Sequence, residues 1–528
     1  MENSDQKAKQ LPAPRLLRSG AITAGATFLS RILGMFRDIA IASLLGAGLS
    51  SDVFFFSNRI PNFFRRLFAE GAFAQSFVPV MTKTKQNKSE ESLRELAAKS
   101  AGTLGLIVLI ISLIGMIASP VVTAIFGWGW FEAWYKGESD GAKFIEASNL
   151  LRITFPYLFF ITLTALCCSI LNIFGRFAIP AITPCILNIV LIITAYLIAP
   201  GFSDPNLILA IGMVIGGLCQ LLFVLPSVYK LGLLVRPRWG WNHEGVKTIR
   251  TLMIPALFGV SASQLNLLVN TILASFLATG AISYLYYSDR LLEFPIGIFA
   301  VAISTVILPA LSRVNIKTDA ESYQKTLDWG VRLVLLLGIP SMMGIIALRE
   351  PILRVLFMRG AFSSEHVLLS SASLLASVSG LCAIMLVRVL VQGFAAIQDT
   401  KTPVRCGIIS IGANIIFNLI LVYPLDYVGL ALSTALAAYV NAGQLLYLLN
   451  KRKIYTPSTY SLKFIGKALI AALCMAGLVR YLAPTFNEWI DLSTLIACAY
   501  LAFYVILGGM TFTLVCLILG IRPRDIKM

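Results

Sequence analysis

The sequence has very little histidine and no recognisable motif for chemistry at a metal or nucleotide. Only His243 and His366 occur among 528 residues, too few to predict a histidine metal centre. The nine cysteines lie inside apolar runs without a CxxC spacing, which indicates core residues. No GxxxxGK[ST] loop, HExxH motif, acidic magnesium cluster or paired nucleophile and base is present. We therefore expect no cofactor, no metal and no catalytic residue, and a protein that is not an enzyme.

Charged residues are also scarce, at 13% of the chain, whereas 57% of the residues are hydrophobic. This composition excludes a soluble globular protein and indicates an all-α polytopic membrane protein. Since one span needs about 20 apolar residues, the runs between polar breaks predict about 14 transmembrane helices. The runs are 19–46, 51–82, 95–119, 147–174, 179–200, 205–229, 249–278, 281–312, 326–348, 366–397, 403–424, 427–450, 462–482 and 491–520.

The basic residues outside these runs sort into alternate loops. Residues 83–99, 230–250 and 451–453 are rich in Lys and Arg, whereas the loops near Gly48 and Gly280 carry neither. The positive-inside rule then places both termini in the cytoplasm, with a first span that is retained and not cleaved as a signal peptide. Net charge +17 therefore reflects membrane topology and not nucleic-acid binding. Three arginines after the ninth run contradict the pattern, as a local exception or because that span is misplaced: Arg349, Arg354 and Arg359.

The chain contains an internal repeat. Residues 42–45 and Gly48 recur as residues 274–277 and Gly280, and the aromatic pair at 54–55 recurs at 286–287, all at an offset of 232. The duplicated unit holds six spans, so both copies have the same orientation, as in transporters built from parallel repeats. The predicted parts are a cytoplasmic tail (1–18), an N-lobe (19–229), an amphipathic cytoplasmic linker (230–248), a C-lobe (249–453), two further spans (454–521) and a cytoplasmic tail (522–528). For the linker, a strip on the membrane surface and a plain connecting loop both stay open.

Several charged side chains lie inside the first two spans. An arginine at the centre of a membrane helix costs roughly 2.5 to 3.5 kcal/mol, so such residues indicate a protein-lined aqueous cavity. Asp52, Arg59 and Arg66 are seven residues apart and share a face of a straight helix. Pro61 can reset that phase, which leaves open whether Arg65 or Arg66 faces the cavity. The other charged residues of these spans are Arg31, Arg37, Asp38 and Glu70.

The second copy of the repeat also carries charge within its spans. Asp289, Arg290 and Glu293 lie in the eighth run, where Arg290 and Glu293 form an i, i+3 pair that predicts a salt bridge. Arg388 in the tenth run is a further candidate. No lysine occurs between Arg15 and Lys83, and guanidinium groups match phosphate oxygens two at a time. We expect a cavity for an anion with more than one phosphate, the alternative being an ion-pair network that only holds helices in register.

Three sequence blocks carry a family resemblance. Residues 30–38 (SRILGMFRD), 59–73 (RIPNFFRRLFAEGAF) and 286–295 (YYSDRLLEFP) resemble the signatures of the bacterial MurJ (MviN) family of lipid II flippases. The resemblance extends over the whole chain and implies the multidrug/oligosaccharidyl-lipid/polysaccharide exporter superfamily, with two six-helix lobes around a cationic cavity. The Trp-rich loop 127–143 is peculiar to this chain.

The resemblance implies a function in peptidoglycan biosynthesis, cell wall biogenesis and cell shape. Family members flip lipid II, the undecaprenyl-pyrophosphate-linked disaccharide-pentapeptide, from the cytoplasmic to the periplasmic leaflet of the bacterial inner membrane. Lipid II, the membrane and the cell-wall synthesis machinery are the implied partners, and spans 13 and 14 form a groove for the lipid tail. The resemblance assigns substrate contacts to Arg31, Arg37, Asp52, Arg65 and Arg290, and less strongly to Glu70 and Glu293. Together with the positions chosen from charge alone, the predicted substrate-binding residues are Arg31, Arg37, Asp52, Arg59, Arg65, Arg66, Glu70, Asp289, Arg290, Glu293 and Arg388.

Alternating access is the expected mechanism, with the energy source left open between an ion gradient, the membrane potential and consumption of the product. Three alternatives remain. A cation-coupled multidrug exporter would need an acid-lined cavity, a flippase for another polyprenyl-pyrophosphate oligosaccharide would share the arginines, and an intramembrane enzyme would need a catalytic cluster.

Overall fold

The computed structural model describes residues 13–87, 89–314 and 319–526, and the regular elements of this part of the chain are all helices. This confirms the predicted all-α fold. The elements, in chain order, are α1 (Ala13–Leu45), α2 (Leu49–Phe64), η1 (Arg65–Phe73), α3 (Ala74–Asn87), α4 (Glu90–Ile117), α5 (Ser119–Phe126), α6 (Trp128–Lys136), α7 (Gly141–Thr154), α8 (Pro156–Ile173), α9 (Ala178–Ile193), η2 (Thr194–Ile198), η3 (Ala199–Gly201), α10 (Pro205–Tyr229), α11 (Glu244–Ala274), α12 (Ala281–Pro295), η4 (Ile296–Ala300), α13 (Val301–Arg313), α14 (Ala320–Phe357), α15 (Ser364–Val378), α16 (Leu381–Ala396), α17 (Lys401–Lys451), α18 (Thr459–Leu482), α19 (Phe486–Asp491), α20 (Thr494–Ile518) and η5 (Pro523–Ile526).

Ten helical segments in the described residues are long and apolar enough to cross a membrane. One of them, α17, is broken at Asp426 (φ 52°, ψ −137°), where the sequence predicts the loop between the eleventh and twelfth spans. The predicted runs at 19–46, 51–82 and 249–278 are helical as well but are not among the ten. The chain is thus a multi-pass membrane protein, and the count of fourteen spans stays a prediction.

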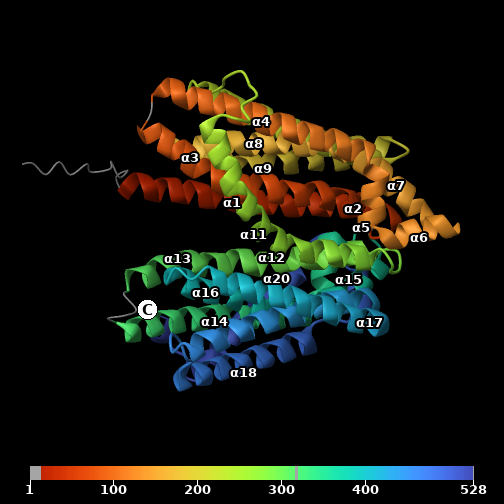
Figure 1. Ribbon diagram of the computed structural model, residues 1–528. Coiled ribbons are helices and arrows are strands. Elements are labelled where there is room, and N and C mark those ends of the chain that lie inside the picture. The colour runs from red at the N-terminus through yellow and green to blue at the C-terminus, as the bar shows by residue number, and fades with distance from the viewer. Residues whose placement is uncertain (1–12, 88, 315–318, 527–528) are drawn as a thin grey trace, which may run out of the picture. The chain divides into compact units, whose positions relative to one another are not determined.

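The chain divides into two compact units. Unit 1 comprises the described residues up to 44, 56–125 and 134–264, and unit 2 comprises 45–55, 126–133 and the residues from 265 onward. In unit 1, α8 packs against α4 and α10, with α4 and α8 side by side in Figure 1. The core there is formed by fully buried side chains such as Phe77, Leu158 and Val224.

In unit 2, the long helix α14 packs against α16, α18 and α20. It is broken at Leu348 (φ −113°, ψ 18°), the residue where the ninth run was predicted to end, and a second helical stretch carries Arg349 and Arg354 on to Phe357. Arg354 is only 4% exposed and donates hydrogen bonds from Nε to the Trp489 carbonyl (2.8 Å) and from Nη2 to the Leu492 carbonyl. This guanidinium therefore satisfies carbonyl groups at the end of α19. That role explains why a basic residue occurs on the side of the membrane where the predicted loops carry few Lys and Arg residues.

A π-helical segment interrupts the second span of each predicted lobe. η1 follows Pro61 and η4 follows Pro295, and at the repeat offset of 232 residues 65–68 correspond to residues 297–300. Proline removes one helical hydrogen bond, and the wider turn takes up the mismatch. The straight helix on which the shared face of Asp52 and Arg66 depends is therefore absent.

Candidate substrate-binding site

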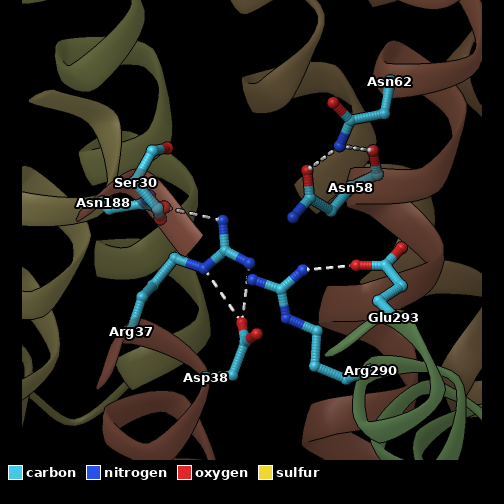
Figure 2. A network of polar contacts seen from close by, with 8 residues as sticks. All are labelled: Ser30, Arg37, Asp38, Asn58, Asn62, Asn188, Arg290 and Glu293. Carbon is cyan, nitrogen blue, oxygen red and sulfur yellow. Dashed lines mark hydrogen bonds and ion pairs between the residues drawn. The ribbon is translucent and has the colours of Figure 1, made fainter. Parts of the chain in front are cut away.

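On α1, the guanidinium of Arg37 is fixed by a carboxylate and an amide (Figure 2). Its Nε and Nη2 donate to Asp38 Oδ1 at 2.9 and 2.7 Å, and its Nη1 donates to Asn188 Oδ1 at 3.1 Å. Asn188 on α9 is itself fixed, because its Nδ2 donates to the Ser30 carbonyl at 3.1 Å. Asp38 is fully buried and Arg37 is 18% exposed, so this pair is a partly desolvated ion pair inside unit 1.

On α2, an asparagine pair positions the next cation. Asn62 Nδ2 donates to the carbonyl and to Oδ1 of Asn58, at 2.9 and 2.8 Å, as Figure 2 shows. Asn62 Oδ1 is thereby turned to accept from Arg65 Nε at 3.0 Å. Arg66 lies on a different side of the first π-helical turn, is exposed, and donates to Gln264 Oε1 at 3.4 Å. Adjacent arginines thus have different surroundings, which spacing alone cannot predict.

Asp52 caps a helix that lies far away in the sequence. Its Oδ2 accepts from the Gly280 N–H at 2.6 Å and its Oδ1 from the Ser283 N–H at 2.9 Å, within unit 2. The Ser283 hydroxyl lies 2.6 Å from Asp52 Oδ1 and 2.8 Å from Ser51 Oγ. A carboxylate at the first turn of α12 satisfies otherwise unpaired N–H groups and interacts favourably with the helix dipole. The structure therefore gives Asp52 a capping role, and its predicted contact with substrate stays a prediction.

Residues that are equivalent in the repeat touch each other around this cap. Ser51 and Ser283 are 232 residues apart and bonded, and Phe55 contacts Tyr287, also at that offset, edge to face at 5.5 Å. Phe55 also stacks on Tyr286 with ring centroids 3.8 Å apart. Such self-contacts arise when two copies of one segment meet at the axis that relates them. The contacts agree with the predicted duplication, which stays a prediction.

Gly46 allows a close approach of the chain beside this contact. Its φ is +68°, and a Cβ atom there would lie 2.5 Å from the Ala361 carbonyl oxygen. Its own carbonyl accepts from the Tyr287 hydroxyl at 3.1 Å. A side chain at this position would force the segment before α2 away from residue 361.

On α12, Arg290 forms the ion pair predicted from its spacing. Its Nη1 lies 2.7 Å from Glu293 Oε2, and the two side chains are 21% and 56% exposed (Figure 2). Asp289 beside it is exposed. The more buried member is the cation, so the carboxylate is the member with room to move away when another anion arrives.

Arg388 on α16 lines a cavity of about 340 Å³ within unit 2. Asn266, Thr434 and Asn441 line the same cavity, and the amide oxygens of Asn266 and Asn441 are buried without a hydrogen-bond partner. A guanidinium beside amide oxygens suits a ligand that presents an acidic group and an N–H or O–H donor together.

The predicted site residues fall into both units. Arg31, Arg37, Arg59, Arg65 and Arg66 belong to unit 1, whereas Asp52, Asp289, Arg290, Glu293 and Arg388 belong to unit 2. The Glu70 side chain lies outside the described residues. A shared chamber for these guanidiniums therefore stays a prediction. Sequence reasoning missed the neutral positioning groups Asn58, Asn62 and Asn188, because an asparagine in a membrane span is unusual but its partner is not visible from spacing.

Comparisons with known proteins agree on one family. The model of a family described as lipid II flippase MurJ matches residues 41–500. A probable lipid II flippase MurJ of Vibrio cholerae is 48% identical over 513 residues, which cover 97% of this chain and 98% of the relative. The lipid II flippase MurJ of Burkholderia cenocepacia is 35% identical over 510 residues, covering 94% and 97%.

Solved structures add the fold. A lipid II flippase MurJ in an inward closed conformation superposes with a TM-score of 0.78 at 29% identity, covering 94% of this chain and 98% of that one. An inward-facing MATE family multidrug transporter superposes with a TM-score of 0.65 but at 13% identity, covering 82% and 98%. The second likeness extends to the fold alone.

Proposed function

The chain belongs to the lipid II flippase MurJ family, and from this premise we propose how its charged spans carry the substrate. Its function is to flip lipid II, so it is a transporter and not an enzyme. We propose that it does so from the cytoplasmic to the periplasmic leaflet of the bacterial inner membrane, with both termini in the cytoplasm. The alternation of basic loops supports this orientation.

The observation that carries the mechanism is that Arg37 and Arg290 each form an ion pair with a carboxylate nearby in the chain, Asp38 and Glu293 respectively. A buried guanidinium without a counter-ion is costly, so each carboxylate stabilises the empty site. The diphosphate of lipid II offers more oxygens and more charge than one carboxylate, and its oxygens match the planar donors of arginine. We propose that it displaces Glu293 from Arg290 and adds to the contacts of Arg37. Asp38 stays in place because it is fully buried.

The remaining predicted residues extend this scheme. Arg31, Arg59 and Arg65 are proposed as further contacts to the diphosphate, with Arg65 aimed by Asn62. Arg388, in its own cavity, is proposed to contact a different part of the substrate. Asp289, Arg66 and Glu70 are assigned to the polar lining of the substrate path.

Alternating access requires a contact that breaks when one side of the site opens. The cap of Asp52 on α12 and the Ser51 and Ser283 pair are proposed as that contact. They join the start of α2 to the start of α12, the two segments that the repeat predicts at the same ends of the lobes. Neutral and charge-assisted hydrogen bonds of this kind are strong enough to hold one state and weak enough to be exchanged.

We also propose roles for the two lobes, the linker and the last two spans. The lobes are residues 19–229 and 249–453, joined by the linker 230–248, and the spans within 454–521 hold the polyprenyl tail. We propose that no cofactor takes part and that an ion gradient, the membrane potential or removal of product drives net transport. The cell-wall synthesis machinery is the proposed consumer.

Reconstitution tests the proposal. Proteoliposomes with labelled lipid II in one leaflet should show transfer with the wild-type protein and loss of transfer with Arg37→Gln and with Arg290→Gln. Arg405→Gln, an exposed cation at the start of α17, should leave transfer unchanged. Export of a cationic dye with no movement of lipid II would favour a drug exporter, and release of phosphate would favour an enzyme.

A further inference from the structure

The segment between α10 and α11, residues 231–243, is an ordered strap whose role the transport mechanism does not explain. Leu233 is 5% exposed and belongs to the core of unit 1, with Leu231 and Val235 packed against the same core. Trp239 and Trp241, in contrast, are 53% and 40% exposed. The strap is therefore amphipathic without being a helix: one side is anchored and the other presents aromatic rings.

The strap is held against α4 at a defined level. The Arg238 N–H donates to the Ala98 carbonyl at 3.0 Å, and the Gly240 N–H donates to Thr103 Oγ1 at 3.0 Å. A Cβ atom on Gly102 would lie 2.2 Å from the Arg238 carbonyl oxygen, so the backbones are in direct contact. Along α4, a membrane span, the charged first turns end near Lys99 and the apolar stretch follows. The strap therefore lies at the level where membrane meets water.

The exposed side of the strap is an aromatic and basic platform. The rings of Trp239 and Trp241 are parallel within 4° at 5.9 Å, and the Arg250 guanidinium lies 4.0 Å from the Trp241 ring centroid. Lys99 Nζ reaches the Trp239 carbonyl at 3.4 Å. Over residues 230–250 the basic residues are Lys230, Arg236, Arg238, Lys247 and Arg250, against the single acid Glu244.

We propose that this strap binds the headgroups of acidic phospholipids in the adjoining leaflet. Indole rings prefer the interfacial region, where the ring is in contact with acyl chains and the N–H with water. Arginine and lysine at the same level attract lipid phosphates and add a preference for anionic over zwitterionic lipid. Charge complementarity thus favours a lipid surface over a protein partner. The site is separate from the residues proposed to hold lipid II.

Fluorescence quenching by brominated lipid tests this site in the full-length protein. Because the chain has seven tryptophans, the strap signal is the difference between wild type and Trp239→Phe/Trp241→Phe, in nanodiscs of one fixed composition. We expect brominated phosphatidylglycerol to quench this difference at least about twofold more than brominated phosphatidylcholine at the same mole fraction. Arg236→Gln/Arg238→Gln should abolish the preference, whereas Lys451→Gln/Lys453→Gln, which removes two cations from another loop, should retain it.

Other outcomes overturn the proposal. Equal quenching by both lipids would show an interfacial strap without headgroup recognition, and no quenching by either would place it away from the membrane. Loss of the preference on adding inorganic phosphate would indicate a site for free phosphate. Lipid II transfer by the Trp239→Phe/Trp241→Phe protein serves as the folding control, and the single variant Trp239→Phe replaces it if the double variant does not fold.

Discussion

The starts of α2 and α12 correspond to each other at the repeat offset of 232, yet their N-terminal turns are capped differently. In the first copy, the Gly48 N–H is capped locally by Ser51 Oγ at 2.8 Å. In the second, the equivalent Gly280 N–H is capped by Asp52, which comes from the first copy. The backbone differs as well, because Gly280 has a positive φ of 98° and Gly48 does not. The cap is thus local in the first segment and long-range in the second.

The copies also differ in charge at the depth of the proposed site. At the repeat offset, Arg290 corresponds to Asn58, which binds the neutral Asn62 and carries no charge. In the first copy the cations follow Asn58 at later positions, at Arg59, Arg65 and Arg66. The comparison shows that two segments at the repeat offset can share a π-helical turn while their charged groups lie at different positions.

The largest expected effect comes from making the second copy resemble the first. Arg290→Asn places the residue of the first copy on α12 and removes a charge-assisted contact to the diphosphate. We expect lipid II transfer in proteoliposomes to fall at least about 30-fold, equivalent to about 2 kcal/mol of binding. Glu293→Gln, which keeps the cation, should reduce transfer much less. Equal losses in the two variants would show that the ion pair, and not the cation, is required.

The next effect concerns the cap between the copies. Asp52→Asn keeps the size of the side chain but removes its charge from the start of α12, so we expect a loss of stability of about 1 to 2 kcal/mol. Thermal unfolding in detergent measures this. Asp399→Asn, which removes a half-buried local cap at the start of α17, is the matched comparison and should cost less. A smaller loss for Asp52→Asn would mean that the long-range cap contributes little.

A smaller effect isolates the contact of equivalent residues. Ser51→Ala and Ser283→Ala each remove one hydroxyl, and a double-mutant cycle gives their coupling free energy. We expect about 0.5 to 1 kcal/mol, the net value of one hydrogen bond in a protein. Additive effects of the two substitutions would contradict a direct interaction.

The smallest effect is a pH dependence at the local cap of α17, Asp399. A hydrogen bond from the Thr402 hydroxyl, followed by the contacts with Arg452, lowers the pKa of Asp399 from 3.8 to about 2. Because the pKa is lower in the folded state, this group stabilises the protein above its usual pKa and the contribution is lost as pH falls toward 2. Since the pair is partly exposed, we expect less than about 1 kcal/mol. The difference in melting temperature between wild type and Asp399→Asn should shrink from pH 7 to pH 3.

The sequence predicted those parts of the fold that depend on local composition. The apolar runs predicted the helices, and the polar break near Asp426 predicted the point at which α17 is interrupted. The i, i+3 spacing predicted the Arg290 and Glu293 pair. Each of these follows from residues within a few turns of one another, where helical geometry alone fixes the distance.

The parts that could not be predicted depend on contacts between distant residues. The phase of α2 beyond Pro61 changes in a π-helical segment, whose length local propensity does not specify. The capping role of Asp52 is not visible in the sequence, because the Gly280 N–H that it accepts from is 228 residues away. Arg354 opposed the charge pattern because that pattern counts residues in loops, and this residue lies inside the protein.

The hydrogen bonds of Arg354 also bear on how the last two spans move. Separating α14 from the segment between α19 and α20 would leave a buried cation and its carbonyl partners without hydrogen bonds. The free-energy cost would be far greater than that of sliding two apolar helix surfaces past each other. We therefore expect α18 and α20 to move together with α14 as one rigid group. A polyprenyl chain bound to α18 and α20 would then move with α14, and no separate hinge would be needed at the carboxyl end of the protein.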